Sequence, residues 1–167
     1  MDQLTKKEVI EPEIWRKAMS SFAAGVTIVA CLDAKGRAQG MTVSAFSSLS
    51  MEPPLCLVCI NSEVSTYPHI LSRGYFSVNI LQASQEELSN KFAMAAEEER
   101  FTNLSTTPAG RGSPFIDDSL VNIDCKLEEK ISAGDHDILI GRPIEIKIAD
   151  SKSLPLVYWN RDYREFK

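Results

Sequence analysis

A run of hydroxyl side chains between residues 42 and 50 is the part of this sequence best suited to hold a ligand. The run has no charged side chain, and its hydroxyl residues are Thr42, Ser44, Ser47, Ser48 and Ser50. Hydroxyl and free backbone N–H groups can together hold a phosphate or the polar edge of a heteroaromatic ring without positive charge. Such a site would suit a flavin. The same serines could instead face solvent along an ordinary strand, because serine is mostly exposed in proteins.

A second polar loop, one histidine and three aromatic residues could complete such a site. The loop at 61–66 reads Asn-Ser-Glu-Val-Ser-Thr, and His136 lies in a Gly-Asp-His corner. His136 could contact a cofactor, or it could be a turn residue whose ring hydrogen-bonds the local backbone. The aromatic residues could pack over the fold or stack on a ligand. They are Tyr158, Trp159 and Tyr163.

Several common catalytic and metal-binding motifs are missing from the sequence. It contains no G-x-x-x-x-G-K-[ST] phosphate loop, no G-x-G-x-x-G opening a helix and no G-x-S-x-G nucleophile motif. His69 and His136 have no metal-like spacing. Cys56 and Cys59 would point to opposite faces of a strand and have no second pair, so we expect buried thiols rather than zinc ligands. Phosphoryl transfer, serine hydrolysis and zinc chemistry are therefore disfavoured, and no metal is expected.

Composition and charge restrict the partners and the compartment. The 167 residues are 44% hydrophobic and carry a net charge of −5, which favours neither nucleic acid nor an anionic membrane as a partner. The N-terminus lacks the apolar stretch of a signal peptide, and the charge-free run 38–51 is too short and too polar to span a bilayer. We therefore expect a cytoplasmic protein with one domain over residues 1–167, in which residues 1–11 form a flexible tail.

Short strands separated by turn residues dominate the pattern. Apolar residues at helical spacing predict helices over 14–22, 66–71 and 84–95. Apolar runs or period-two alternation predict strands over 26–32, 55–60, 75–80, 121–127, 138–140 and 144–148. Closely spaced strands with so few helices favour a closed or nearly closed antiparallel barrel with peripheral helices.

Three segments carry more detailed expectations. Phe76, Val78 and Ile80 alternate with polar or amphipathic residues, which predicts a half-buried strand. Ser84 and Glu87 have the spacing of a capping box at the start of a helix. Residues 103–115 are rich in proline and glycine, and we expect a long surface loop there.

Taken together, these motifs resemble the flavin reductase-like family of FMN-binding split barrels. The resemblance extends over roughly residues 15–166, and the order and spacing of the motifs carry it. The motifs are Gly40–Leu55, Ser65–Thr66, Gly74–Asn79, Lys91–Ala93, Arg100–Phe101, Gly134–His136 and Pro155–Tyr158. The resemblance implies a mainly β fold, a six-stranded antiparallel Greek-key split barrel with peripheral α-helices, usually found as a homodimer with flavin near the interface.

The resemblance also implies which residues bind flavin and nicotinamide. Flavin contacts would come from Thr42, Val43, Ser44, Ala45, Ser47, Ser48, Cys59, Ile60 and Asn61, with Ser65, Thr66, Lys91 and Phe92 near the phosphate. The nicotinamide nucleotide would contact His136 and Tyr163.

The implied activity resembles that of the NAD(P)H:flavin oxidoreductases that serve two-component monooxygenases. Hydride would pass from C4 of NADH or NADPH to N5 of FMN or FAD, a reaction that needs two aligned rings and no acid–base pair, so no catalytic side chain is expected. Reduced flavin would then reach a partner monooxygenase. The alternative is a non-catalytic or electron-carrying protein that keeps its FMN tightly bound.

Overall fold

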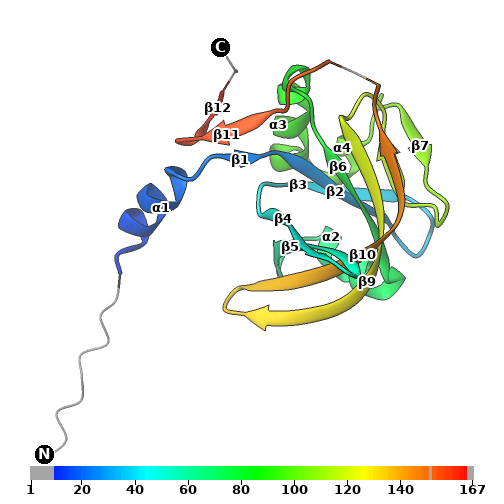
Figure 1. The fold of residues 1–167 in the computed structure, drawn as a ribbon, viewed down its shortest axis with the longest axis horizontal. Coiled ribbons are helices and arrows are strands. Elements are labelled where there is room, and N and C mark those ends of the chain that lie inside the picture. The colour runs from blue at the N-terminus through cyan, green and yellow to red at the C-terminus, as the bar shows by residue number, and fades with distance from the viewer. Residues whose placement is uncertain (1–9, 151, 165–167) are drawn as a thin grey trace, which may run out of the picture.

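The largest sheet of this computed structural model curls into a barrel (Figure 1). The structure describes residues 10–150 and 152–164. In spatial order, the seven antiparallel strands of this sheet are β3 (Ala38–Val43), β2 (Thr27–Leu32), β6 (Tyr75–Ile80), β9 (Val121–Ala133), β10 (His136–Ile148), β5 (Pro54–Asn61) and β4 (Phe46–Met51). The predicted mainly β, antiparallel barrel with peripheral helices is confirmed.

The two edge strands of this sheet are neighbours in the chain. Only Ser44 and Ala45 separate β3 from β4, so the chain passes from one edge of the sheet to the other over two residues. The backbone N–H of Cys59 donates to the carbonyl of Ala45 at 2.9 Å, which draws this passage against β5. The sheet has seven strands, one more than the six that the resemblance implies, and β3 and β4 count separately because the chain breaks its pairing at Ser44 and Ala45.

The helices and the remaining strands lie around the barrel. The helices are α1 (Pro12–Ser20), α2 (Thr66–Arg73), the 3₁₀ turn η1 (Ala83–Gln85), α3 (Glu86–Met94) and α4 (Glu97–Arg100). A three-stranded sheet contains β1 (Ala24–Gly25), β11 (Val157–Trp159) and β12 (Asp162–Arg164), and a hairpin contains β7 (Thr106–Pro108) and β8 (Pro114–Ile116). None of the helices among the described residues reaches the length and apolar character that a bilayer crossing requires.

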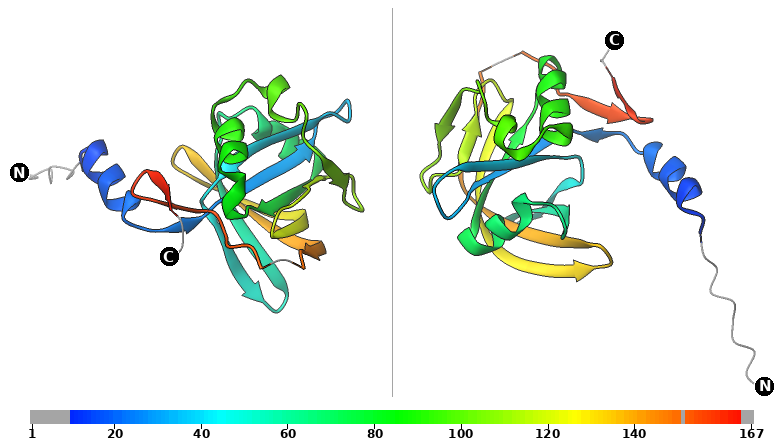
Figure 2. Two further views of the ribbon diagram at one scale, coloured as in Figure 1. Left: turned by 90° about the horizontal axis from the view of Figure 1, so that it is seen from above. Right: turned by 180° about the vertical axis from the view of Figure 1, so that it is seen from behind.

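The first helix projects away from the barrel, beside the C-terminal hairpin (Figure 2). A helix is confirmed here, two residues earlier at each end than the predicted 14–22, but it buries no side chain within its own chain. Trp15 is 55% exposed and Phe22, just beyond the helix, is 78% exposed. The apolar face of α1 is therefore free to pack against a molecule other than the described chain.

Two apolar clusters hold the barrel together. The interior cluster includes Val29, Val58, Phe76 and Leu139, with Ile70 of α2 packed against it. The second cluster lies between the outer face of β2 and α3, and it includes Ile28, Leu81, Phe92, Ile116 and Leu156. Because the barrel wall is packed on both sides here, β2 is buried along nearly its whole length.

The predicted half-burial of β6 is wrong, because both faces of this strand are covered. Ser77 and Asn79 are fully buried beneath the β7–β8 hairpin. The Ser77 hydroxyl donates to the Pro114 carbonyl at 2.5 Å, and the Asn79 side-chain oxygen accepts the backbone N–H of Ile116 at 2.9 Å. Asn122 also donates to Asn79, at 2.8 Å. These polar groups fasten the hairpin to the sheet.

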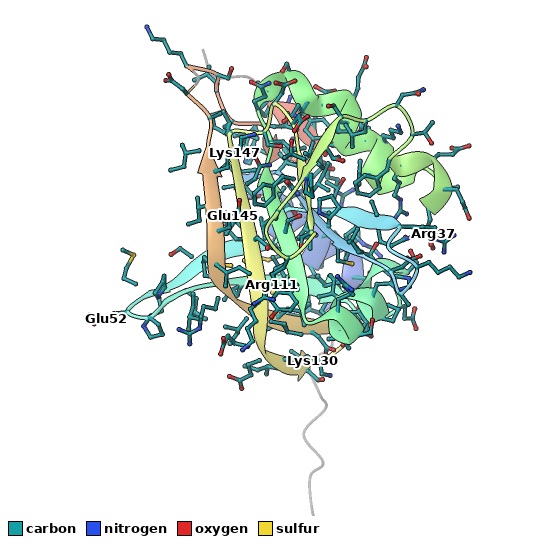
Figure 3. All side chains as sticks on the ribbon, turned by 90° about the vertical axis from the view of Figure 1, so that its right-hand side faces the viewer. Arg37, Glu52, Arg111, Lys130, Glu145 and Lys147 are labelled. Atoms are coloured by element: carbon teal, nitrogen blue, oxygen red, sulfur yellow. The ribbon has the colours of Figure 1, made fainter. Side chains whose placement is uncertain are left out.

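The expected surface loop at 103–115 is therefore wrong over its second half. Residues 113–116 are buried, and the tip of the hairpin is held from β10, where Glu145 accepts the backbone N–H of Gly110 at 2.7 Å. Figure 3 shows this side of the molecule, with Arg111, Glu145 and Lys147 labelled. The proline and glycine residues of this segment form a tight hairpin. Buried polar side chains of the sheet make hydrogen bonds to its backbone groups, which allows the hairpin to pack against the sheet.

The capping box predicted at Ser84 and Glu87 is also wrong. The box is formed two residues earlier, where the backbone N–H of Gln82 donates to the side-chain oxygen of Gln85 at 3.0 Å. The chain enters α3 through a 3₁₀ turn, so the capped end precedes the α-helix itself. The helix predicted at 66–71 is confirmed as α2, and Gly74 ends it in the left-handed conformation.

We expect Gly141→Ala to destabilise the barrel by about 1–3 kcal/mol, because an added methyl group overpacks the interior. A Cβ at position 141 would lie 2.7 Å from Cζ of Phe76 and 3.0 Å from Cβ of Cys125. Urea unfolding would measure the loss. Gly25→Ala is the matched control, since no atom lies within 4 Å of its added Cβ. Equal midpoints for the two variants would contradict this packing.

We expect Asp33→Asn to lower stability near neutral pH and to flatten its dependence on acid. The backbone N–H of Arg37 is the main group that lowers the pKa of Asp33 from 3.8 to about 2. A carboxyl group with a lowered pKa stabilises the fold above its unfolded value, and this contribution is lost as the pH falls from 3.8 to about 2. Thermal unfolding against pH would show a steeper acid loss in the wild type, with Asp118→Asn behaving like the wild type.

Candidate functional site

Three adjoining hollows meet at Ser44, where β3 passes to β4. The Trp15 hollow, of about 770 Å³, lies between α1 and the start of β4. The Tyr163 hollow, of about 260 Å³, lies between β3, α3 and the C-terminal hairpin. The Asn61 hollow, of about 240 Å³, lies between β3 and the end of β5. Ser44 lines all three, so they form one continuous candidate site.

The Asn61 hollow gathers most of the residues that the sequence singled out. Those lining it are Thr42, Val43, Ser44, Ala45, Cys59, Ile60, Asn61 and His136. His136 lies here because β10 pairs with β5 in a register that sets it opposite Asn61. Strand pairing thus brings residues 75 positions apart in the sequence to one wall of the site.

Two backbone N–H groups are free in this wall. Pairing of β2 with β3 ends at Val43, and pairing of β4 with β5 begins at Phe46. Among the described residues, the backbone N–H groups of Ser44 and Ala45 make no hydrogen bond. Unpaired backbone donors beside a hollow are suited to acceptor atoms of a bound ligand.

The serines of this segment face outward. Ser44, Ser47 and Ser48 are exposed, and a flavin-binding role for them stays a prediction. The Ser47 hydroxyl donates to the carbonyl of Ser48 at 3.1 Å and lines the Trp15 hollow. Ser48 lines none of the three hollows.

The four residues expected near a phosphate lie outside these hollows. Thr66 is fully buried in α2, and its hydroxyl has no hydrogen-bond partner. Phe92 packs edge to face on Phe101, with ring centroids 4.9 Å apart. Lys91 donates to the carbonyl of Thr102 at 2.7 Å. Ser65 precedes α2 and is half-buried, and a phosphate role for this group stays a prediction.

The Tyr163 hollow depends on a serine that the sequence reasoning missed. The hydroxyls of Ser89 and Tyr163 lie 2.8 Å apart, and Tyr163 also donates to the side chain of Asn90 at 3.2 Å. Thr42 donates to the carbonyl of Ser89 at 2.6 Å. Ser89 thus connects Thr42 of β3 to Tyr163. The sequence signal that could have identified Ser89 was a polar residue on the buried face of the helix predicted at 84–95.

A buried polar group braces the strand behind His136. The Tyr67 hydroxyl donates to Asp137, and the Lys130 ammonium lies 3.1 Å from the same carboxylate. The Tyr67 hydrogen bond is the main cause that lowers the pKa of Asp137, and the same bond raises the pKa of Tyr67. This group fixes α2 to β10, and the sequence analysis did not identify it.

The C-terminal hairpin holds α1 in place. Arg161 is 2.7 Å from the Glu13 carboxylate, the Trp159 indole donates to the carbonyl of Ser21 at 3.1 Å, and the backbone N–H of Asn160 donates to Ser20 at 2.8 Å. Tyr158 and Trp159 are partly exposed, so they line the surface rather than the core. The largest hollow therefore has a wall made by both ends of the described chain.

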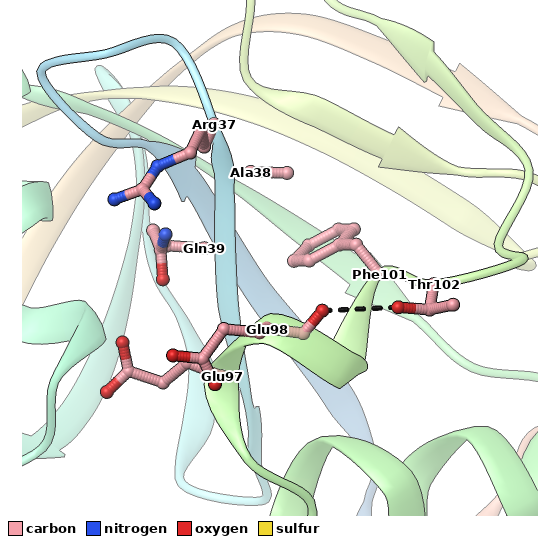
Figure 4. A pocket seen from close by; sticks show the side chains of 7 residues that line it. All are labelled: Arg37, Ala38, Gln39, Glu97, Glu98, Phe101 and Thr102. Carbon is pink, nitrogen blue, oxygen red and sulfur yellow. Dashed lines mark hydrogen bonds between the residues drawn. The ribbon is translucent and has the colours of Figure 1, made fainter.

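Two other hollows contain none of the expected site residues. One, of about 390 Å³, lies between β3 and α4 (Figure 4) and is lined by Arg37, Ala38, Gln39, Glu97, Glu98, Phe101 and Thr102. The other, of about 360 Å³, lies beside Asp124, whose pKa is raised by burial. Across residues 10–150 and 152–164, no three acidic, histidine or cysteine side chains gather as a metal site would require.

Comparison with known proteins decides the family. The family model for the flavin reductase like domain matches residues 19–167. The chain belongs to this family. The FMN reductase (NADH) RutF of Stutzerimonas stutzeri is 37% identical over 152 residues, which cover 90% of this chain and 86% of that protein. A Rhizobium meliloti relative is 38% identical over 135 residues, which cover 81% of this chain but 43% of that longer protein.

Solved structures of flavin reductase-like proteins share the fold. A structure from Haemophilus somnus has a TM-score of 0.88 at 39% identity, covering 93% of this chain and 99% of its own. BorF, the flavin reductase component of a bacterial two-component tryptophan halogenase, has a TM-score of 0.84 at 30% identity, covering 92% and 97%. The expected split barrel is thus supported by structures as well as by sequence.

The residues at the Asn61 hollow fit the flavin that this family implies. The polar edge of the isoalloxazine ring carries several acceptor atoms, and the free N–H groups of Ser44 and Ala45 supply donors beside them. The side chain of Asn61 adds both donor and acceptor capacity at the same wall. Among the residues that line this hollow, His136 is the only one with a ring that can gain or lose a proton. The hollow is therefore suited to recognise a ligand through neutral donors.

We expect Ser89→Ala and Tyr163→Phe to be coupled by about 1 kcal/mol, because each removes one partner of the same hydrogen bond. Urea unfolding of the wild type, the two single variants and the double variant would give this coupling energy. Additive effects of the two substitutions would show that Ser89 does not hold Tyr163.

Proposed function

We propose that this chain is an NAD(P)H-dependent reductase of FMN or FAD. The observation that carries the proposal is the position of His136 opposite Asn61, in a hollow where Ser44 and Ala45 present free backbone N–H groups. Flavin contacts and a nicotinamide contact would thus share one wall. The FMN reductase (NADH) name of a relative at 37% identity supports the same activity.

The chain's contribution to the reaction is binding and alignment. When bound, flavin and nicotinamide supply the hydride chemistry themselves. Thr42, Val43 and Cys59 line the hollow in which a flat ring would lie, and the N–H groups of Ser44 and Ala45 would stabilise negative charge at its polar edge. His136 and Tyr163 would orient the nicotinamide nucleotide from β10 and β12. No side chain has to exchange a proton with substrate.

We further propose that reduced flavin passes to a partner monooxygenase. The hollows open at the surface and join around Ser44, so a flavin bound there has a path to solvent. BorF, at 30% identity, is a reductase component of a two-component system. The second candidate, a carrier that keeps FMN bound, would also use the Asn61 hollow but would not need His136.

A homodimer is part of this proposal. The exposed apolar residues of α1 and of the far half of β10 include Ile14, Trp15, Met19, Ile144, Ile146 and Ile148. Extended apolar surfaces of this kind mark protein interfaces. A second copy of the chain would cover them and would also close the Trp15 hollow, in agreement with the family's expected flavin position near an interface.

We expect multiple turnovers when the protein is mixed anaerobically with NADH or NADPH and an excess of FMN, followed by loss of visible flavin absorbance. His136→Ala should raise the KM for the nicotinamide nucleotide roughly five-fold, because about 1 kcal/mol of hydrogen bonding is lost. His69→Ala, in α2 and outside the three hollows, is the control. Reduction limited to one equivalent would favour the carrier instead.

We expect sedimentation equilibrium to give twice the 18.6 kDa chain mass. A double variant, Ile144→Asp with Ile146→Asp, should sediment as a monomer, because charges would replace exposed apolar contacts on β10. Lys147→Ser changes the neighbouring residue on the opposite face and should remain dimeric. A wild-type monomer, or a dimeric double variant with native circular dichroism, would contradict the placement of the interface.

A further inference from the structure

A tight turn places an aspartate against the histidine of the site. Gly134 and Asp135 form the two-residue turn between β9 and β10, with Ala133 paired to His136. Gly134 has a φ of +69°, which suits the first position of a type II′ turn. The following residue then extends its side chain alongside the start of β10. Nδ1 of His136 lies 2.8 Å from Oδ1 of Asp135.

The backbone on either side of His136 is held firmly. The carbonyl of Asp135 accepts the N–H of Ser62 at 3.2 Å, and His136 pairs with Asn61 across β5. The next residue, Asp137, is buried and bound by Tyr67 and Lys130. With the backbone fixed, the remaining freedom at this position is rotation of the imidazole ring and the location of its proton.

The Asp135 carboxylate determines where that proton lies. His136 lowers the pKa of Asp135, chiefly through their hydrogen bond, so the carboxyl group is ionised at neutral pH. An ionised carboxylate only accepts hydrogen bonds, which requires the proton of a neutral imidazole to reside on Nδ1. Nε2 is then an acceptor. Carboxylates fix the tautomer and orientation of metal-bound histidines by the same contact.

We propose that Asp135 is a positioning residue that holds His136 in the Nδ1–H tautomer and presents Nε2 as a hydrogen-bond acceptor to the nicotinamide nucleotide. The carboxamide N–H₂ of nicotinamide is a donor of matching chemistry. The proposal rests on the proposed reductase function for its ligand, and on the 2.8 Å contact for its geometry.

The exposure of Asp135 and His136 indicates which property should change when Asp135 is removed. The Asp135 side chain is 84% exposed and that of His136 is 46% exposed, so the contact contributes little to folding. A bound nucleotide would shield the contact from water and make it stronger. Removing Asp135 should therefore change substrate affinity much more than the stability of the free protein.

Nitrogen NMR tests the tautomer without relying on activity. The chain has two histidines, so a ¹⁵N-labelled sample at pH 8 gives two imidazole patterns, and His69→Gln identifies which belongs to His136. We expect the Nδ1–H form for His136 in the wild type and a loss of that preference in Asp135→Ala. An Nε2–H form in the wild type, or an unchanged pattern in the variant, would overturn the proposal.

Kinetics test the consequence for the substrate. Asp135→Ala should raise the KM for NADH roughly five-fold with little change in kcat, and Asp135→Asn should recover part of the loss because its amide oxygen still accepts a hydrogen bond. Asp150→Ala, outside the three hollows, is the matched control. An unchanged KM in Asp135→Ala, in an enzyme that turns over NADH, would overturn the proposal.

The two measurements separate this proposal from the function on which it rests. Absence of any NADH or NADPH turnover in the wild type would refute the reductase function, and the NMR result would still decide whether Asp135 sets the tautomer of His136. Normal turnover combined with an Nε2–H tautomer would refute the positioning role alone.

Discussion

The passage of the chain from β3 to β4 at Ser44 and Ala45 is the constraint on which the rest of the structure depends. The chain leaves one edge of the sheet and joins the other within two residues, and the Cys59–Ala45 hydrogen bond extends the pairing of β4 with β5 up to this passage. The same passage interrupts regular pairing, so two backbone donors stay free. Closure of the fold and creation of a binding wall are thus two results of one backbone path, and the three hollows meet at this point.

Local pattern predicted the three longest helices and five of the seven strands of the barrel sheet, because apolar periodicity and turn residues act over a few positions. The end of α2 at Gly74 and the presence of a strand over 121–127 are examples. The burial of Ser77 and Asn79 could not be predicted this way, since it depends on β8, whose contacts with these two residues come from 37 positions later in the chain. A polar residue looks the same in sequence whether water or a distant backbone satisfies it.

The residues of the candidate site were likewise predicted only in part. Residues 42–45 and 59–61 were grouped by the resemblance, and the structure brings them together along one hollow. Ser89 and the Tyr67–Asp137–Lys130 group were missed, since their roles arise from contacts between a helix and a strand that no short motif specifies. Of the residues expected near a phosphate, Thr66 and Phe92 are buried in the packing, and the phosphate role of this group stays a prediction.

The segments that build the site are widely separated along the chain. One wall comes from a continuous stretch between residues 42 and 61, whereas His136 and Tyr163 arrive on later hairpins that meet it only through strand pairing and the Ser89 contact. Separate segments of the sequence therefore encode the two walls of the site. Exchange of the β9–β10 turn or the β11–β12 hairpin between relatives would replace one wall while leaving the other intact, so preference for one nucleotide could change while flavin recognition is retained.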